Sequence, residues 1–216
     1  MKNFVKGILA GVCISFGGWI YIVCGYKMQP SLNVLGALFF SLGLMLICNF
    51  GYYLYTGKIC YLFDDKSQIK SRLINLLLGL VGNVLGCLIV GFLFREVFVK
   101  NDEMLLLFVD KLVAGKTNKE WYEMLLASVC CGMFVYFAVE GFRASENHIV
   151  KNLFIIIFVS AFIISGFEHC VANMFYFFAG GSYTLKTLFM LICCILGNSA
   201  GGLIVPLVTK YINKDK

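Results

Sequence analysis

The chain carries few charged residues. Asp, Glu, Lys and Arg make up only 14% of its 216 residues, whereas 60% are hydrophobic. A typical soluble domain has about 25% charged residues. The charges occur in short clusters between long apolar runs, and no soluble domain fits between these runs. Together with a mean hydropathy of +0.86, this composition predicts an integral membrane protein.

The sequence also lacks the patterns of metal, catalytic and nucleic-acid sites. Its ten cysteines include no C-x-x-C pair and most lie within apolar runs, which favours packing over metal or disulfide chemistry. No H-E-x-x-H motif or second histidine cluster occurs, so a membrane-embedded enzyme is disfavoured. The net charge of +6 is scattered over loop ends without interleaved aromatics. We therefore expect no metal, cofactor, catalytic residue or nucleic-acid partner.

Six apolar runs are long enough to cross a bilayer, which takes about 20 residues of helix. The expected spans are 4–25, 31–62, 73–94, 121–142, 149–179 and 183–212. The first run has no small-residue cleavage site before it ends, so we interpret it as a retained helix and not as a signal peptide. With both termini cytoplasmic, eleven of the 18 Lys and Arg residues lie inside, so the positive-inside rule predicts that orientation.

The chain matches itself at an offset of 115 residues. The segment Leu80–Val90 (LVGNVLGCLIV) aligns with Ile195–Val205 (ILGNSAGGLIV), and a glycine, an asparagine and a second glycine recur at the same places. At nearly the same offset, Leu9–Cys13 resembles Leu126–Cys130. Such self-similarity indicates an internal repeat.

Each half contains three spans, so the second half must enter the membrane from the side opposite to the first. This is inverted-repeat architecture, in which an axis in the membrane plane relates the two halves. We divide the single transmembrane domain, 1–216, into repeat one (1–95), a connecting loop (96–115) and repeat two (116–212).

The second and fifth spans run about 30 residues, which is longer than one crossing requires. Glycine and polar residues near their middles predict breaks near 49–58 and 165–173, with Gly51 opposite Gly166. Glycine permits the irregular backbone that a break needs. Interrupted helices of this kind place the permeation site of a transporter near the midplane of the membrane.

Glu168 and His169 are ionisable residues inside an apolar span, where such residues are costly and mark functional sites by default. Because neighbours in a chain point apart, we expect His169 to face the pore. Glu168 would then face the protein and accept hydrogen bonds from the broken backbone. The alternative is a packing histidine whose ring is satisfied by a carbonyl. Burial and the nearby carboxylate act oppositely on the imidazole, so its protonation state stays open.

Four other polar residues are candidates for the pathway. Thr56, at the break of the other half, can donate a hydrogen bond to an anion, although threonine before glycine is also a common turn former. Asn198 lies in a glycine element suited to helix packing, and it is a candidate for the pore wall. Lys116 and Lys119 can concentrate anions at the outer mouth or serve as a solvated loop end.

Three motifs resemble those of the formate/nitrite transporter family. Gly166–Met174 (GFEHCVANM) is similar to the family's signature around its central histidine. Leu54–Gly57 (LYTG) resembles its second-span loop, and Gly197–Gly201 (GNSAG) is similar to a third family element. The resemblance covers nearly the whole chain, and the histidine motif is highly specific.

The resemblance implies an aquaporin-like protomer in a homopentamer, each protomer with its own pore between two apolar constrictions. It implies that His169 is the central histidine, Thr56 its partner and Asn198 a further pore residue. Lys116 fits the family's vestibule lysine, with Lys119 close enough to compete. Glu168 and Asn173 belong to the expected pathway, and the implied constriction residues are Phe40, Leu44, Leu54, Tyr55 and Phe162.

The chain departs from the family pattern in three places. The amphipathic N-terminal segment with its vestibule lysine is missing, which puts gating by such a helix in doubt. Gly132 stands where the family usually has asparagine, and Tyr55 stands where an aromatic without a hydroxyl is common. A more polar or wider constriction, favouring hydrosulfide or nitrite over formate, is the expected consequence.

From these features we expect a cell-membrane channel or transporter for small monovalent anions such as formate, nitrite or hydrosulfide. Transport is either passive conduction of the anion or proton-coupled passage of the neutral acid. The alternatives are a channel for water or neutral solutes and a non-conducting membrane scaffold.

Overall fold

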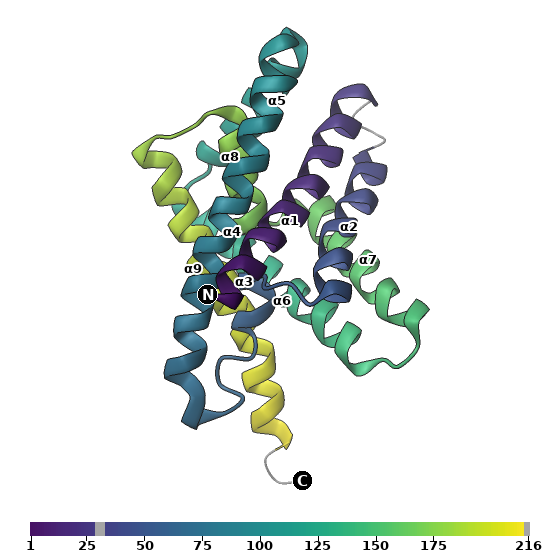
Figure 1. Ribbon diagram of the computed structural model, residues 1–216, viewed down its shortest axis with the longest axis vertical. Coiled ribbons are helices and arrows are strands. Elements are labelled where there is room, and N and C mark those ends of the chain that lie inside the picture. The colour runs from purple at the N-terminus through teal and green to yellow at the C-terminus, as the bar shows by residue number, and fades with distance from the viewer. Residues whose placement is uncertain (29–32, 214–216) are drawn as a thin grey trace.

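The computed structural model describes residues 1–28 and 33–213, and over these residues the secondary structure is entirely helical (Figure 1). The α-helices are α1 (Lys2–Lys27), α2 (Asn33–Phe50), α3 (Tyr55–Ile59), α4 (Ile69–Val97), α5 (Glu103–Thr117), α6 (Trp121–Ala144), α7 (His148–Ile164), α8 (Cys170–Gly180) and α9 (Leu185–Ile212). Two short 3₁₀ turns, η2 (Lys66–Gln68) and η3 (Val99–Asn101), flank α4. The all-α prediction is confirmed.

The helices account for the six predicted spans. Helices α1, α2, α6 and α9 and the stretch Lys66–Asn101 are each long and apolar enough to cross a membrane. The expected second span corresponds to α2 followed by α3, and the fifth to α7 followed by α8. Both breaks fall within the predicted segments. The predicted start of the second span at residue 31 lies outside the described residues, as do Lys214 and Lys216 of the charge count.

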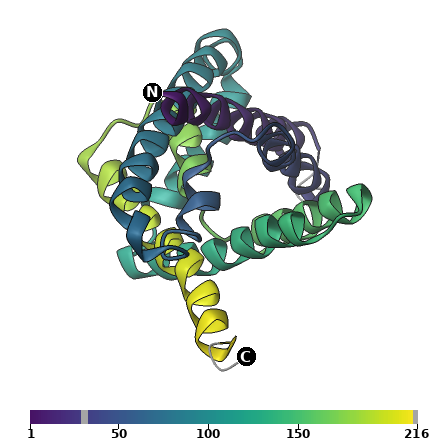
Figure 2. The ribbon, with the colours of Figure 1, turned by 60° about the horizontal axis from the view of Figure 1, so that its bottom comes forward.

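The two halves run in opposite senses. In Figure 1, α1 and α4 ascend, whereas α9 descends to the C-terminus. We call the end of the molecule with the C-terminus the lower end and the end where α4 leads towards α5 the upper end. Helix α1 packs along α4, and α6 packs along α9. Seen with the lower end forward, α1, α2 and α7 enclose one side of a ring, and α4 and α9 enclose the other (Figure 2).

Glycines allow the first and third helices of each half to pack backbone against backbone. A Cβ atom on Gly11 of α1 would overlap the Asn83 carbonyl of α4, and one on Gly132 of α6 would overlap the Asn198 carbonyl of α9. Gly11 is therefore the counterpart of Gly132, an offset of 121 residues. The predicted pairing of Leu9–Cys13 with Leu126–Cys130 is wrong by four positions, because packing against the third helix and not local similarity sets the register.

Most of the predicted connecting loop, 96–115, belongs to helices. Helix α5 starts after Asp102, whose carboxylate accepts a hydrogen bond from the Leu105 N–H at 3.0 Å and caps the helix. Leu105, Val109 and Val113, spaced four residues apart, are the buried residues of α5, which packs on α8. The loop prediction was wrong because the charged residues of this stretch concealed a single apolar stripe.

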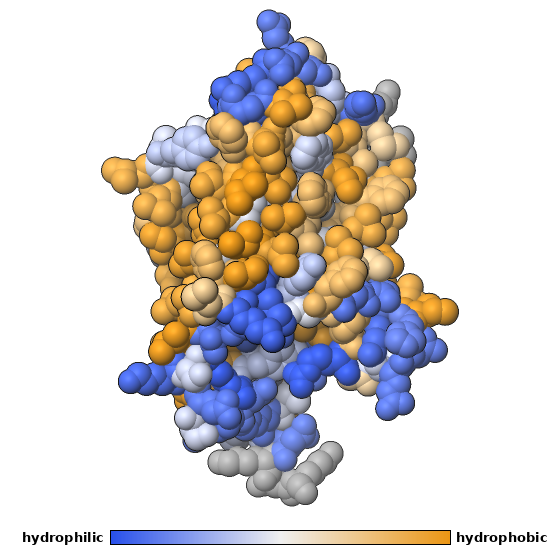
Figure 3. Space-filling view, viewed as in Figure 1, coloured by the Kyte–Doolittle hydropathy of each residue, from blue (hydrophilic) through white to orange (hydrophobic). Residues whose placement is uncertain are grey.

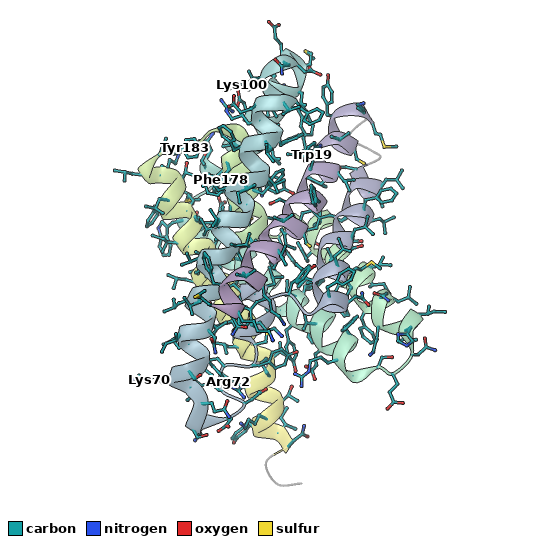
Figure 4. All side chains as sticks on the ribbon, viewed as in Figure 1. Trp19, Lys70, Arg72, Lys100, Phe178 and Tyr183 are labelled. Atoms are coloured by element: carbon teal, nitrogen blue, oxygen red, sulfur yellow. The ribbon has the colours of Figure 1, made fainter. Side chains whose placement is uncertain are left out.

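The surface is hydrophobic over its middle and hydrophilic towards both ends (Figure 3). Lys70 and Arg72 mark the lower end of α4, and Lys100 lies at its upper end (Figure 4). Between them α4 exposes large apolar side chains such as Leu77 and Phe92. An apolar belt bounded by charge fits a protein embedded in a bilayer.

Candidate functional site

The two helix breaks are built alike. Gly51 follows α2 with φ +67°, and Gly166 follows α7 with φ +71°. This left-handed conformation is one that glycine adopts without steric cost. After each glycine the chain runs extended for a few residues before the next short helix begins, at Tyr55 in the first half and Cys170 in the second. The offset between the paired positions is 115 residues in both cases, as the sequence repeat predicts.

An asparagine of the third helix holds each break. Asn83 Oδ1 accepts a hydrogen bond from the Tyr55 N–H at 2.9 Å, and its Nδ2 donates to the carbonyls of Gly7 and Tyr53 at 2.9 and 3.0 Å. These three bonds satisfy the amide group and connect the break to α1. Unpaired backbone groups inside a membrane protein are costly, so the asparagine compensates for the interrupted helix.

Asn198 repeats this arrangement in the second half. Its Oδ1 accepts from the Cys170 N–H at 2.8 Å, and its Nδ2 donates to the carbonyls of Ser128 and Glu168, each at 2.8 Å. Asn198 is fully buried and lines neither of the two cavities beside the breaks. We expected the Asn198 side chain in the pore wall; in the structure it instead binds the backbone around the second break. The role of Asn83 was missed, although the repeated G-N-x-x-G element contained the signal.

His169 caps the N-terminus of α8. Its Nδ1 accepts a hydrogen bond from the Ala172 N–H at 3.1 Å, and its Nε2 lies 2.8 Å from Thr56 Oγ1. Because Nδ1 is occupied as an acceptor, a neutral ring carries its hydrogen on Nε2 and donates it to Thr56. If the ring were doubly protonated, the hydrogen on Nδ1 would point at the Ala172 N–H, and two donors would repel each other. The geometry thus favours a neutral imidazole that serves as a donor through Nε2.

Glu168 binds side chains and not the broken backbone. Its Oε2 lies 2.6 Å from Lys116 Nζ, its Oε1 lies 2.9 Å from Lys119 Nζ, and Asn173 Nδ2 donates to Oε2 at 3.0 Å. The expectation that this carboxylate accepts backbone N–H groups is wrong, because α5 brings two ammonium groups to it. The carboxylate is 4% exposed, so pairing offsets the cost of burying its charge.

Lys116 and Lys119, the two candidates for the vestibule lysine of the family, have similar surroundings in the structure. Lys116 ends α5 and lies 5.2 Å from the centre of the Tyr176 ring, whereas Lys119 lies in the link to α6. Their side chains are 13% and 30% exposed. Both contact Glu168, one on each oxygen, and both line the same cavity.

Two cavities approach each other from opposite ends of the bundle. The upper cavity has a volume of about 300 Å³. Its wall contains three lysines, from α5 and from the link between α5 and α6, and several residues around His169. The lining includes Lys111, Lys116, Lys119, Phe40, Phe162, Glu168, His169 and Asn173. The lower cavity, of about 120 Å³, is lined by Leu44, Ile47, Leu54, Gly57, Lys58, Val139 and Arg143 among others. Glu168 thus lines the upper cavity together with His169, although its side chain is only 4% exposed.

A short apolar segment separates the cavities. Phe40 lines the upper cavity and Leu44 the lower one, and the two residues are one helical turn apart on α2, a rise of about 6 Å. The Phe40 and Phe162 rings pack edge to face with centroids 6.3 Å apart, and Phe162 stacks on the His169 ring at 6.0 Å. Four of the five residues predicted for the constriction therefore line one of the two cavities next to this segment: Phe40, Phe162, Leu44 and Leu54.

The two departures at Tyr55 and Gly132 do not change the cavity walls. The Tyr55 hydroxyl lies 2.8 Å from Ser199 Oγ on α9, and Tyr55 lines neither cavity. Gly132 packs against the Asn198 backbone. The predicted widening or polarity of the constriction at these positions is therefore not present in this structure.

The cysteines form no site either. All ten are free thiols, and no group of three or more His, Cys, Asp or Glu side chains among the described residues is placed to hold a metal ion.

Two cavities separated by a short apolar segment, inside a bundle of apolar helices, fit the architecture of a channel or transporter. The model of the formate/nitrite transporter family matches residues 1–212, so the chain belongs to that family. The resemblance noted in the sequence is confirmed.

Individual relatives agree with this assignment. A protein of Methanothermobacter thermautotrophicus named "Probable formate transporter" is 32% identical over 234 residues, covering 94% of this chain and 85% of its own. Formate channel FocB of Escherichia coli is 26% identical over 180 residues, covering 80% of this chain and 64% of its own. The solved structure of a pentameric formate channel with formate bound superposes with a TM-score of 0.87 at 26% identity, covering 100% of this chain and 97% of that one.

Proposed function

We propose that the protein conducts small monovalent anions, of the class of formate, nitrite and hydrosulfide, through the constriction between its two cavities. The observation that carries this proposal is the Thr56–His169 pair, two buried side chains that can donate hydrogen bonds beside the apolar segment. A donor without a full charge can stabilise an anion in a low-dielectric constriction without trapping it. Phe40, Phe162, Leu44 and Leu54 would exclude water and hydrated ions.

The charges at the cavities support an anion over a neutral solute. Lys111, Lys116 and Lys119 line the upper cavity with Glu168 as the one carboxylate, and Lys58 and Arg143 line the lower cavity. Cations that line a recess raise the local concentration of anions. A channel for water or glycerol gains nothing from such an excess of positive charge.

The proposed passage uses the hydrogens of the central pair in turn. In the resting pair Nε2–H of His169 donates to Thr56 Oγ1, and the Thr56 hydroxyl has no other hydrogen-bond partner in the described part of the chain. An arriving anion can accept the hydrogen of Thr56 first and then that of Nε2. The ring need not change its protonation, because Nδ1 stays bonded to the Ala172 N–H.

This geometry favours conduction of the bare anion over transfer of a proton from the ring. A neutral imidazole that gave up its Nε2 hydrogen would become an imidazolate beside the backbone, which is a high-energy species. Flux should therefore follow the anion concentration and the membrane potential. Passage of neutral formic acid would instead fall about tenfold for each pH unit above the pKa of formic acid, because its protonated fraction falls by that factor.

Assembly and orientation complete the proposal. The pentameric relative superposes over the whole chain, which supports a homopentamer with one pathway in each protomer. The excess of Lys and Arg on the side of the termini supports cytoplasmic termini in the cell membrane. The family consists of transporters and channels, so we propose no enzymatic activity.

Purified protein in liposomes provides the test. Formate, nitrite and hydrosulfide uptake are measured by stopped flow under an imposed membrane potential, with glycerol swelling as the neutral comparison and protein-free liposomes as the blank. We expect anion uptake that reverses with the potential, and His169→Phe should reduce it strongly. The matched control is His148→Phe, because His148 is exposed at the start of α7. Glycerol uptake without anion uptake, or unchanged anion flux in His169→Phe, would contradict the proposal.

A further inference from the structure

The lower cavity contains a lysine at the position that corresponds to a neutral amide in the upper cavity. The offset of 115 residues pairs Lys58 with Asn173 and Tyr53 with Glu168. In the upper half, Asn173 donates to the Glu168 carboxylate. In the lower half, Lys58 Nζ lies 5.9 Å from the centre of the Tyr53 ring. The repeat therefore replaces an acid and an amide with an aromatic and a cation, and the carboxylate that neutralises the upper lysines has no lower counterpart.

The other charged side chain that lines the lower cavity is already paired. Arg143 lines the same cavity, lies 3.4 Å from the Glu140 carboxylate and stacks over the Tyr61 ring at 4.4 Å. Glu140 also accepts a hydrogen bond from the Tyr61 hydroxyl at 2.7 Å. Within the described residues, Lys58 forms no ion pair, and its side chain is exposed.

A second recess confirms that the carboxylates near Lys58 are engaged elsewhere. This recess, of about 320 Å³, shares Lys58 and Arg143 with the lower cavity and contains Asp64. The Asp64 carboxylate lies 3.9 Å from Arg72, which also donates to the Tyr61 carbonyl. Of the two cations that line the lower cavity, Lys58 is thus the one without an ion pair among the described residues.

We propose that Lys58 is a binding residue for small monovalent anions at the lower mouth and that it loads the constriction from that side. Lys58 follows Leu54 by four residues, and both line the lower cavity next to Leu44. An anion held beside the ammonium group is therefore at the entrance to the apolar segment. This inference rests on the proposed function and adds to it a second, independent entry site for the same ligand class.

Single-channel recording in planar bilayers with formate as the anion tests the proposal. An antibody to a C-terminal tag reports which face of the bilayer carries the lower mouth, because the C-terminus lies at that end (Figure 1). The variant is Lys58→Gln, and Lys58→Arg keeps the charge. The matched control is Lys70→Gln, because Lys70 is an exposed lysine at the same end and lines neither cavity (Figure 4).

At an ionic strength of about 0.01 M, where charges act over about 30 Å, Lys58→Gln should lower the current of formate entering from the lower face about two- to fivefold. The loss should disappear near 1 M salt, where the screening length is about 3 Å. Formate entering from the upper face should be affected less, and Lys58→Arg and Lys70→Gln should match the wild type.

Equal currents in Lys58→Gln and wild type, or an equal loss from both faces, would overturn the role of Lys58. A wild-type protein that carries no formate would instead refute the proposed function, so the two failures are distinguishable. Pentamer assembly of each variant is checked by size-exclusion chromatography. If Lys58→Gln fails to assemble, Lys58→Met, which keeps an unbranched side chain one atom shorter than lysine, is held to the same criteria.

Discussion

Thr56 Oγ1 lies 2.8 Å from His169 Nε2, and this hydrogen bond joins the break of the first half of the chain to the break of the second. Thr56 belongs to α3 and His169 immediately precedes α8. Both side chains are buried, with 0% and 4% of their surface exposed. The two short helices, one from each half of the chain, thus meet through one hydroxyl and one imidazole.

Replacing Thr56 with valine tests the function of this bond. Valine keeps the shape but leaves the Nε2–H of His169 without its acceptor, which costs about 1 to 3 kcal/mol, and it removes one donor from the constriction. We expect formate uptake into liposomes to fall roughly tenfold. Thr56→Ser, which keeps the hydroxyl, should retain most of the flux. Wild-type flux in Thr56→Val would show that the bond has no part in transport.

The paired carboxylate at Glu168 makes a prediction about stability. Glu168→Gln leaves the ammonium group of Lys116, only 13% exposed, without its counter-charge, and breaking a buried pair in this way costs about 3 to 5 kcal/mol. Lys119→Gln should cost about 1 kcal/mol or less, because the Lys119 side chain is 30% exposed and solvent screens its pair with Glu168. Thermal unfolding in detergent measures both. Equal melting temperatures for the two variants would contradict the ranking.

The sequence predicts the positions of the two breaks well because they follow from the repeat. Gly51 and Gly166 are aligned by the offset of 115 residues, and each lies in a span too long for a single crossing. The offset pairs His169 with Leu54 and Thr56 with Val171, so the contact between Thr56 and His169 does not follow from the repeat. It was expected only from the resemblance to the family.

The partners of Glu168 are beyond sequence reasoning for a physical reason. Lys116 and Lys119 lie about 50 residues before Glu168, and only the packing of α5 on α8 brings them to it. The apolar stripe at Leu105 and Val109 was available in the sequence, but charged residues on the other side of the helix concealed it. Sequence alone indicates that a buried charge needs a partner and not which residue supplies it.

Gly132 and Gly115 give a matched pair of glycine substitutions. A Cβ atom at Gly132 would overlap the Asn198 carbonyl, so Gly132→Ala must separate α6 from α9. We expect a loss of about 1 to 3 kcal/mol or failure to assemble, as for overpacked cores. Nothing lies within 4 Å of a Cβ at Gly115 of α5, and Gly115→Ala should stabilise the helix by up to about 1 kcal/mol. Melting temperatures that change alike would contradict the packing argument.

Asp102 gives a pH-dependent prediction. The Leu105 N–H and, next, the Tyr26 hydroxyl hold the pKa of the Asp102 carboxyl below its ordinary value of 3.8. A carboxylate whose pKa is lowered by folding stabilises the protein above its unfolded pKa, and that contribution is lost as the pH falls through the folded value. Asp102→Asn should therefore melt below the wild type at pH 7, and the gap should close as the pH drops below about 4.

The control for this prediction is Asp110→Asn, an exposed carboxylate of the same helix. It should melt like the wild type at pH 7. A gap between Asp102→Asn and wild type that stays constant from pH 7 to pH 3 would mean that the charge of Asp102 does not contribute.

Removing either of the two asparagines that hold the breaks should lower the free energy of unfolding by the same amount. Asn83 and Asn198 each accept one backbone N–H and donate to two carbonyls at 2.8 to 3.0 Å, and both are fully buried. Alanine at either position leaves three backbone groups unpaired inside the membrane, which costs about 3 kcal/mol or more in total. Melting temperatures of Asn83→Ala and Asn198→Ala should therefore fall together, whereas Asn152→Ala, at a partly exposed position, should change less.

Their effects on transport should differ, because the second break carries the histidine. Asn198 fixes the Glu168 carbonyl and the Cys170 N–H on either side of His169, so its loss should move the imidazole that we propose donates to the anion. Asn83 fixes the corresponding groups around Leu54, an apolar wall residue. At equal amounts of folded pentamer, Asn198→Ala should therefore lose more formate flux than Asn83→Ala. The reverse order would place the selective step at the break of the first half.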